Sequence, residues 1–547
     1  MDDTRIIREE IASRKRTYES SKSRGLRSLR RGNLNDALYW FYAAARVLGY
    51  FHFGLWMDTV LEEALWQIAN RIDSTNGRVV PVSIRKKQVV HLASYLMDYG
   101  GHSEMILNWS RSLAGLGSPD QYFLSSELPQ ARCTSLELAP HKLMELTRSS
   151  TDCRLCPQKL QPFPRARWLF NELQNIRPDV VILHVHPEDV FSFCAARAAQ
   201  TRLGSRIVYF NMADHLPNIG MAWTDYVADV RTEGARYTQW LRHVSHDKIV
   251  RVPLWSRSRN SARVTRSGLG IPDNATVSTT VTTYYKIRPD RHWDFGKVIY
   301  DLLAGEPTHY HLVVGAGDES DRKSVVERFT AGSTDISRRL IWLGQRSDVD
   351  AILGISDFLI ESFPIAGAVV RLDALVCGVP VIGIRNLQWP LMSDAADFPD
   401  NYPFVGTCNE DIVRFSKVLI AGKELRDSWS KNLLDHYQQH YSQDNLLRAL
   451  GNLLTDKPSP GFPSDLQPPV FEAEYAVPLI MGPFLNDEVL RQNIDSVLGY
   501  SPRTIKGVMA AARSNVRRKA RGAVTRMWRA LPLSNEARQR VKAFLRP

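Results

Sequence analysis

Two series of short apolar segments alternate with helical patterns along this chain, and this alternation constrains the fold more than any other feature. The first series contains QVVHLASYL, VVILHVHP (180–187) and SRIVYFNMADH (205–215). The second begins near residue 275 with ATVSTTVTTYY and continues with HYHLVVGAG, RRLIWLGQ, DFLIESF and VPVIGI. Strands that alternate with helices form parallel sheets covered on both faces. The sequence therefore predicts two α/β domains.

The length and composition are those of a large globular protein. With 547 residues, the chain exceeds the ~250–300 residues that one hydrophobic core supports, so at least two domains are expected. Hydrophobic residues make up 44% and charged residues 23%, and no apolar run approaches the ~18 residues that mark a membrane span. The charged N-terminus, MDDTRIIREEIASRKR, lacks the apolar stretch of a secretory signal. We therefore expect a cytoplasmic protein.

The cysteines predict neither a disulfide framework nor a metal site. Six cysteines are too few for a disulfide scaffold in so long a chain, so free thiols are expected. Cys153 and Cys156 form a C-x-x-C pair, but no second pair and no pair of histidines follows at the spacing of a zinc site. No D-x-D motif lies in a context that would hold a divalent ion. We expect no metal and no other cofactor.

Pattern and composition divide the chain into five parts. Residues 1–80 are helical, and RSLRRGNLNDALYWFYAAARVLG resembles one helical hairpin of the tetratricopeptide type. Such repeats need about three copies to share a core, so we interpret this segment as a helical cap, with protein docking as the alternative. Two Rossmann-like domains are predicted over 86–255 and 270–425. C-terminal helices and a proline-rich linker, TDKPSPGFPSDLQPP (455–469), occupy 426–502.

The fifth part, residues 503–547, carries the whole basic excess of the chain. It has 13 Lys or Arg residues against one acidic residue, Glu536, which accounts for the net charge of +12. Apolar residues recur there at helical spacing beside Trp528, so an amphipathic helix is predicted. A basic amphipathic helix can lie peripherally on an anionic membrane surface, or it can pack on its own domain. The chain shows no recognisable nucleic-acid reader, so no nucleic acid is expected as a partner.

The segment ESFPIAGAVVRLDALVCGVP (361–380) predicts a binding site. It reads as the end of a strand, a turn that contains glycine, and the start of a helix. A helix that starts at a strand end presents free N–H groups and a positive dipole, which suit a diphosphate. Asp373, one turn into the helix, is placed to accept hydrogen bonds from ribose hydroxyls.

These residues resemble the donor-sugar half of GT-B glycosyltransferases, in particular the protein O-GlcNAc transferases and the bacterial enzymes that glucosylate adhesins. That branch carries an acid, a Gly six residues later and an Asp twelve residues later, followed by x-L-x-x-G-x-P. The matching positions here are Glu361, Gly367, Asp373, Leu375, Gly378 and Pro380. The large retaining branch has two acids eight residues apart, and Val369 breaks that pattern. The resemblance covers roughly residues 275–400 and implies a GT-B fold, with two Rossmann-like domains facing a cleft.

The resemblance also implies how the donor is held. TTYYKIRP is similar to the family segment N-Q-x-Y-K-I-x-P, whose Lys contacts the donor phosphates, and Lys286 is the corresponding residue. The helix N-terminus supplies N–H groups around Gly367. The family follows this glycine with His or Asn and Thr, whereas this chain has Ala368, Val369 and Val370. From the fold alone, we expect the nucleobase to meet the loop at Gln345 and Arg346.

The first domain offers candidates for catalysis and for further binding. DYGGHSEMI resembles the glycine loop of many GT-B enzymes, so Gly101 and His102 are expected near the donor phosphate or the acceptor. His186 in LHVHPED, and Asp214 with His215 in NMADHLPN, follow predicted strands at the cleft. Any of these can accept a proton near neutral pH, and each histidine can equally be a structural residue bonded to the backbone. Arg231 and Glu233 are expected near the same cleft.

The leading hypothesis is a glycosyltransferase that moves a sugar from a UDP-sugar donor to an acceptor by a metal-independent, inverting mechanism. The sugar is expected to be a hexose or an N-acetylhexosamine. A lipid-linked glycan or surface polysaccharide is the preferred acceptor, and a protein side chain is the alternative. The second alternative is a noncatalytic module that keeps the fold for binding a partner or a nucleotide.

Overall fold

The computed structural model describes most of the chain up to residue 468. The described ranges are 3–50, 53–72, 86–98, 101–116, 120–128, 135–149, 152–256, 264–290, 292–315, 333–386 and 398–468. The predicted amphipathic tail, 503–547, lies outside them. Within these ranges, no helix is long and apolar enough to cross a membrane.

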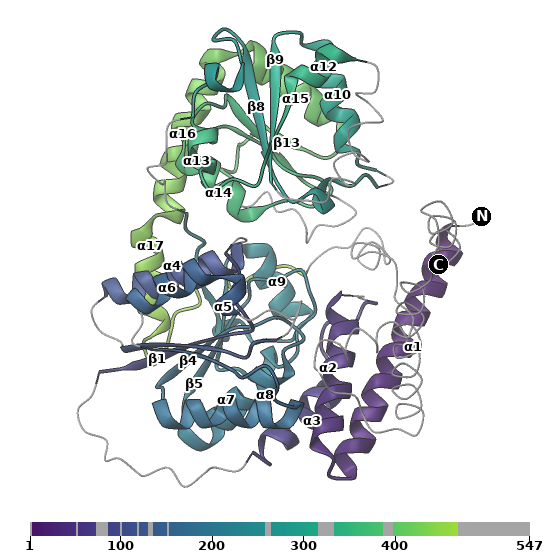
Figure 1. Cartoon of the computed structure of the whole chain (residues 1–547), viewed down its shortest axis with the longest axis vertical. Helices are drawn as coiled ribbons and strands as arrows, with labels where there is room; N and C mark the ends of the chain where they lie inside the picture. The colour runs from purple at the N-terminus through teal and green to yellow at the C-terminus, as the bar shows by residue number, and fades with distance from the viewer. Residues whose placement is uncertain are drawn as a thin grey trace, which may run out of the picture.

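The chain begins with three helices that pack on the first α/β domain. They are α1 (Asp3–Arg30), α2 (Leu34–Tyr50) and α3 (Thr59–Ala69). Asp58 caps α3 by accepting a hydrogen bond from the Leu61 N–H at 3.0 Å. The same carboxylate accepts bonds from the Tyr18 hydroxyl at 2.6 Å and Lys22 Nζ at 2.7 Å, which tie α3 to α1. Their apolar residues share one core with the first domain, and Figure 1 shows them beside α8.

The first domain is a seven-stranded sheet in which all strands are parallel, in the order β3-β2-β1-β4-β5-β6-β7. The strands are β1 (Gln88–Ala93), β2 (Asp120–Ser125), β3 (Asp152–Leu155), β4 (Val180–His184), β5 (Arg206–Phe210), β6 (Tyr226–Asp229) and β7 (Ile249–Arg251). The helices are α4 (Gly101–Gly115), α5 (Ser135–Leu138), α6 (Pro140–Ser149), α7 (Pro162–Ile176), α8 (Val190–Leu203) and α9 (Thr232–Trp240). The strand order reverses between β1 and β4. In open α/β sheets, ligands bind at such a reversal, beyond the carboxyl ends of the strands.

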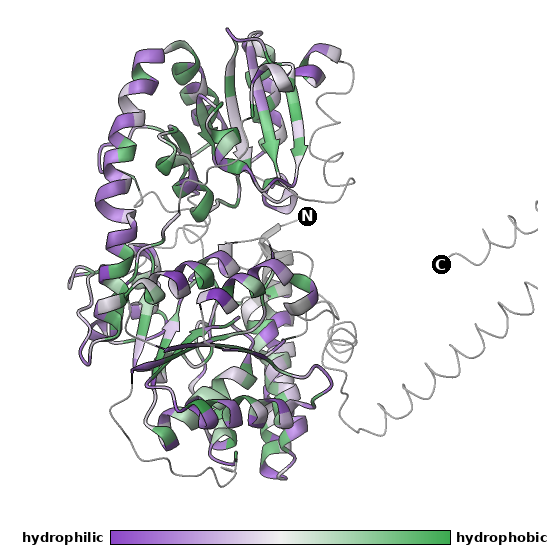
Figure 2. Cartoon of the chain, turned by 60° about the vertical axis from the view of Figure 1, so that its left-hand side comes forward, coloured by the Kyte–Doolittle hydropathy of each residue, from purple (hydrophilic) through white to green (hydrophobic). Residues whose placement is uncertain are grey.

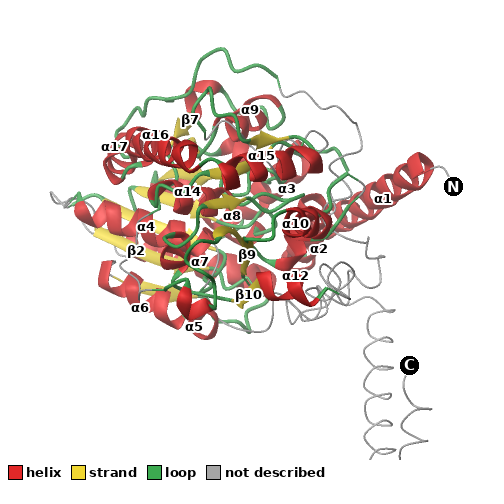
Figure 3. Ribbon diagram, turned by 90° about the horizontal axis from the view of Figure 1, so that it is seen from above, coloured by secondary structure: helices red, strands yellow, loops and turns green. Residues whose placement is uncertain are grey.

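The second domain repeats this plan with six parallel strands in the order β10-β9-β8-β11-β12-β13. The strands are β8 (Thr276–Val281), β9 (His309–Val314), β10 (Leu340–Gly344), β11 (Phe358–Ile360), β12 (Val381–Ile384) and β13 (Val405–Gly406). The helices are α10 (Phe295–Gly305), α12 (Thr334–Arg339), α13 (Val349–Leu353), α14 (Ala368–Val376) and α15 (Asn409–Ala421). Seen from above, helices lie on both sides of the strands, so the prediction of two covered parallel sheets is confirmed (Figure 3).

Two further helices return the chain from the second domain to the first. α16 (Lys423–Tyr441) packs on the second domain, and α17 (Gln443–Leu453) packs against α4 (Figure 1). Leu446, Leu450 and Leu453 on α17 share a core cluster with Trp109 of α4. The proline-rich segment then runs along the edge strand β7, where Arg251 N–H donates to the Pro460 carbonyl at 2.6 Å. This contact covers part of the exposed edge of the first sheet.

Burial explains why these segments form strands. Apolar residues gather on the strands and on the helix faces that turn toward them (Figure 2). β4 is buried at every position, as a central strand covered by helices on both faces requires.

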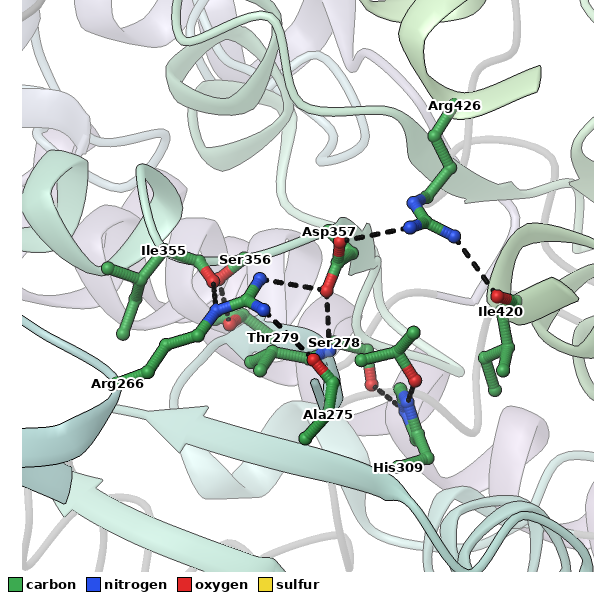
Figure 4. Close-up of polar contacts among 12 residues, drawn as sticks. Arg266, Ala275, Ser278, Thr279, His309, Ile355, Ser356, Asp357, Ile420 and Arg426 are labelled. Carbon is green, nitrogen blue, oxygen red and sulfur yellow. Dashed lines mark hydrogen bonds and ion pairs between the residues drawn. The ribbon is translucent and has the colours of Figure 1, made fainter. Parts of the chain in front are cut away.

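The same aspartate contact recurs at the amino edge of both sheets. Asp179, just before β4, accepts a hydrogen bond from the Gln88 N–H of β1 at 2.7 Å. Asp357, just before β11, accepts the equivalent bond from the Val277 N–H of β8 at 2.7 Å. Figure 4 shows that Asp357 also accepts bonds from Arg266 at 2.9 Å and pairs with Arg426 of α16 at 3.2 Å. This carboxylate therefore joins the interdomain linker, the sheet and α16.

We expect Asp357→Ala to lower the free energy of unfolding by about 2–3 kcal/mol, because it leaves two partly buried arginines and a strand N–H without their acceptor. Urea denaturation measures this change. Asp427→Ala is the matched control: Asp427 also pairs with a cation on α16, but its side chain is 64% exposed, so a loss below about 0.5 kcal/mol is expected. Equal losses in the two variants would contradict this role for Asp357.

Candidate functional site

A cavity of about 540 Å³ lies between the two domains, at the carboxyl ends of both sheets. Its first-domain wall comes from α4 and the loops after β5 and β6. Its second-domain wall comes from the segments after β8, β9, β10 and β11. Ten of the predicted site residues line it: Gly101, His102, Asp214, His215, Lys286, Gln345, Gly367, Ala368, Val369 and Val370. The cavity thus collects residues that are far apart in the sequence.

The N-terminus of α14 and Lys286 form the cationic part of this cavity. Gly367 is the N-cap residue, and Ala368, Val369 and Val370 form the first turn of the helix. Lys286 lies in the short 3₁₀ turn η4 (Tyr284–Ile287), and a Cβ built on Gly367 would lie 4.0 Å from its Nζ. Burial lowers the pKa of Lys286, and the nearby Glu361 opposes this shift. An anion bound here would stabilise the charged ammonium group and raise its pKa again.

A buried ion pair fixes α14 in this position. Arg371 donates to Glu361 Oε1 from Nε at 3.1 Å and from Nη2 at 2.8 Å, and both side chains are at most 2% exposed. The other carboxylate oxygen accepts the Ile384 N–H of β12 at 3.1 Å. Glu361 therefore holds the start of the helix against β11 and β12, a role that the sequence motif does not reveal.

Two of the predicted donor residues lie away from the cavity lining. Asp373 accepts a hydrogen bond from the Ser256 hydroxyl in the linker between the domains. Arg346 is 39% exposed and pairs with Asp348 through two bonds of 2.8 and 2.6 Å. Gln345, the residue before it, does line the cavity. We predicted that Asp373 contacts the ribose and that Arg346 contacts the nucleobase. Neither side chain lines the cavity, so these positions do not support the two predictions.

Two helix N-termini meet across the cavity. Gly101 begins α4, and a Cβ at this position would lie 2.9 Å from Val369 Cγ2 on α14. Only glycine lets the two domains approach this closely. Val369 also packs against the apolar cluster of the first domain that contains Met105 and Trp109. The valine that stands where the family has a polar residue is therefore a packing contact between the domains.

His102 and His186 lie together, but only His102 lines the cavity. His102 Nε2 lies 3.1 Å from the carbonyl oxygen of His184, so Nε2 carries the proton and Nδ1 keeps its lone pair. His186 stacks on Tyr95 at 4.7 Å and contacts the edge of His102 at 5.4 Å. Burial lowers the pKa of His102 to about 3 and that of His186 to about 4, so both rings are neutral near pH 7.

Asp214 and His215 lie on the first-domain wall in different surroundings. Asp214 is buried and accepts two bonds from Arg231, one of them 2.8 Å long from Nη2. Burial alone would raise the pKa of Asp214. The guanidinium of Arg231, with a further contribution from His215, outweighs this effect and holds the pKa well below its usual range. His215 is 31% exposed, and its Nδ1 lies 3.7 Å from Asp214 Oδ1, beyond hydrogen-bond distance. Asp214 thus remains an anion, and His215 is the more exposed of the two side chains.

Arg231 and Glu233, also expected near the cleft, divide between two places. Arg231 lines the cavity, whereas Glu233 lies in the first turn of α9 and pairs with Arg236 at 3.2 Å. Sequence analysis missed several lining residues: Thr282, Thr283, Tyr285, Met105, Met212, Leu254 and Gly315. The two threonines and Tyr285 flank Lys286 in TTYYKI, so their position was a usable signal. The apolar residues carried no such signal, because they resemble ordinary core positions.

Comparison with known proteins identifies the architecture. No family model and no curated protein sequence matches the chain. An O-GlcNAc transferase mutant from Thermobaculum terrenum is 13% identical, covers 79% of this chain and 81% of its own, and gives a TM-score of 0.50. The fold is GT-B. A Rickettsia africae glycosyltransferase is 15% identical over 67% of this chain and 97% of its own, with a TM-score of 0.52.

A third GT-B structure, Anabaena HepE in complex with UDP-glucose, is 12% identical over 67% of this chain and 99% of its own, with a TM-score of 0.50. These comparisons confirm the predicted fold of two Rossmann-like domains that face a cleft. They also confirm, for the fold, the resemblance to the O-GlcNAc transferase branch.

Replacing His186 tests whether its partly buried ring is neutral in the folded protein. Its folded pKa of about 4 lies below the ordinary value of 6.5, so the unfolded chain gains a proton first as the pH falls. The contribution of His186 to stability is therefore full above pH 6.5 and is lost toward pH 4. His186→Phe keeps the stacking but removes this titration. Between pH 7 and 5, we expect wild-type protein to lose up to about 2 kcal/mol more unfolding free energy than the variant.

Urea denaturation at pH 7, 6 and 5 measures this difference, and the comparison removes the contribution of other titrating groups. His141→Phe is the control, because His141 is exposed. A pH dependence that is the same in wild type and His186→Phe would contradict the assignment.

Proposed function

We propose that this protein is a glycosyltransferase that uses a UDP-sugar as donor. The observation that carries the proposal is the meeting of Lys286 with the N-terminus of α14 in the cavity between the two domains. A helix N-terminus and a partly buried lysine suit the diphosphate of a nucleotide. The Anabaena structure of the same fold contains UDP-glucose, which favours UDP as the nucleotide.

The transfer would be a single displacement. The acceptor hydroxyl oxygen attacks the anomeric carbon of the donor sugar. The bond between that carbon and the β-phosphate oxygen breaks, UDP leaves, and the configuration at the anomeric carbon inverts. Lys286 and the N–H groups of the first turn of α14 stabilise the charge that develops on the departing UDP. His215 accepts the hydroxyl proton, with the Nδ1 lone pair of His102 as the second candidate. His186 lies away from the lining, so we no longer assign it this step.

The proposal includes no metal and no other cofactor. The charge of the departing diphosphate is met by Lys286 and the helix dipole. Among the described residues, no three His, Cys, Asp or Glu side chains gather as a metal ion would require. We propose a hexose or an N-acetylhexosamine as the sugar.

The proposed acceptor is a lipid-linked glycan or a surface polysaccharide. The first-domain wall offers His215 and Arg231 beside Met105, Met212 and Leu254, which suits a ligand with both hydroxyls and apolar surface. A protein side chain is the second candidate, favoured by the helices α1–α3 on the same domain. A noncatalytic module is the third. The apolar residues Val369 and Val370 favour it, because they supply no hydroxyl to a diphosphate.

Calorimetric titration with UDP, GDP, ADP and CMP tests the donor site. We expect selective binding of UDP, and Lys286→Ala should weaken it about 10-fold or more, because a hydrogen bond to a charged group contributes ~1.5–3 kcal/mol. The control is Lys297→Ala, since Lys297 is 57% exposed on α10 and pairs with Asp301. Absence of nucleotide binding, or equal affinities in the two variants, would contradict the proposal.

Transfer from radiolabelled UDP-sugars separates the enzyme from the noncatalytic module. His215→Ala is expected to lower kcat about 100-fold or more while UDP affinity stays unchanged, because general-base catalysis contributes ~10²–10⁴-fold. UDP binding with no transfer to glycan or peptide acceptors by the wild-type protein would favour the noncatalytic module.

A further inference from the structure

The loop over residues 211–220 carries Asp214 and His215 into the cavity, and contacts from the N-terminal helical segment hold it. We infer that Trp56 and Glu62 are positioning residues for this loop. Trp56 lies just before α3, and Glu62 lies in its first turn. This inference rests on the proposed function, because it concerns the acceptor side of the same cavity. It assigns the N-terminal segment a part in the site itself.

Arg242 connects Trp56 to the loop. Its side chain is buried, and Nη2 donates to the carbonyl oxygens of Asp214 at 2.6 Å and Leu216 at 2.7 Å. These two carbonyls flank His215, so one guanidinium nitrogen fixes the backbone on both sides of the candidate base. Nε and Nη1 of Arg242 have no hydrogen-bond partner among the described residues.

The indole of Trp56 covers this guanidinium. The ring centroid lies 4.9 Å from Cζ of Arg242, within the range of a cation–π contact. Trp56 also stacks on Tyr237 of α9, with the ring centroids 5.4 Å apart. Trp56 therefore holds the planar group of Arg242 in the orientation in which Nη2 reaches both carbonyls. Because buried arginine is costly without compensation, loss of the ring would disturb this arrangement.

Glu62 holds the other end of the same loop. Its Oε1 accepts a hydrogen bond from the Gly220 N–H at 2.8 Å, and its side chain is buried. Gly220 has φ of +85°, and a Cβ there would lie 2.8 Å from Phe193 and 2.9 Å from Trp223. Only glycine fits at this end of the loop without moving its neighbours, and Glu62 accepts the hydrogen bond of its N–H. Two contacts from the segment 56–62 thus fix the loop at Asp214–Leu216 and at Gly220.

Substitutions at Glu62 test this role in the full-length protein. Glu62→Ala removes the acceptor of the Gly220 N–H, and we expect kcat for sugar transfer to fall about 10-fold or more, with UDP affinity within 2-fold of wild type. Glu62→Gln keeps an oxygen acceptor and is expected to retain kcat within about 2-fold. Glu63→Ala is the control, because Glu63 is exposed on the same helix. Retention of wild-type kcat by Glu62→Ala would overturn the inference.

Trp56→Leu provides an independent test. We expect kcat to fall about 10-fold, again with unchanged UDP affinity, because the loop moves but the donor helix does not. The matched control is Trp66→Leu. Trp66 also lies under an arginine, Arg197 at 5.4 Å, but it is 43% exposed and does not contact the loop. Equal effects of Trp56→Leu and Trp66→Leu on kcat would overturn the positioning role.

Hydrogen exchange of residues 211–220 decides the case if the wild-type protein binds UDP without measurable transfer. Faster exchange of this segment in Glu62→Ala and Trp56→Leu, but not in Glu63→Ala or Trp66→Leu, supports the inference. Unchanged exchange overturns it. Failure of the wild-type protein to bind UDP would instead count against the proposed function, so the two failures are distinguishable.

Discussion

The buried ion pair between Glu361 and Arg371 positions the part of the molecule on which the proposed chemistry depends. It joins the end of β11, the first turn of α14 and the end of β12. Breaking such a pair leaves an uncompensated buried charge, at a cost of ~3–5 kcal/mol. Because the pair sits directly below the N-terminus of α14, it also fixes where the free N–H groups of that helix meet the cavity. Arg371 itself lines the cavity, so this ion pair lies at the proposed donor site.

The two walls of the cavity are built from different kinds of structure. The second-domain wall is built by regular structure, with α14 and η4 following parallel strands of that domain. The first-domain wall combines α4 with an irregular loop, and arginines bind that loop through the Asp214 carboxylate and two carbonyl oxygens. Val369 and Gly101 set the closest approach of the two domains. A binding site of this kind depends on contacts between segments that are more than 200 residues apart in the sequence.

Local pattern was enough to predict the two parallel sheets and several residues of the second-domain wall. Apolar segments located eight of the thirteen strands in the described residues but not β2, β3, β6, β7 or β13, and the spacing from Gly367 to Pro380 located α14. Local pattern does not reveal where a side chain contacts a partner that is distant in the sequence. Asp373 bonds to Ser256, which lies 117 residues earlier, and His186 is enclosed by Tyr95 and His102. The role of Arg242 was also invisible, because its partners are backbone carbonyls and an aromatic ring rather than a charged side chain.

The central claim is that a nucleotide diphosphate binds between Lys286 and the N-terminus of α14. Hydrogen–deuterium exchange with and without saturating UDP tests it most directly, because it reports on the backbone N–H groups themselves. The account predicts slower exchange in residues 283–287 and 366–371, with no change at the amino edges of the two sheets. Protection confined to another surface, or no protection of the first turn of α14, would contradict the account.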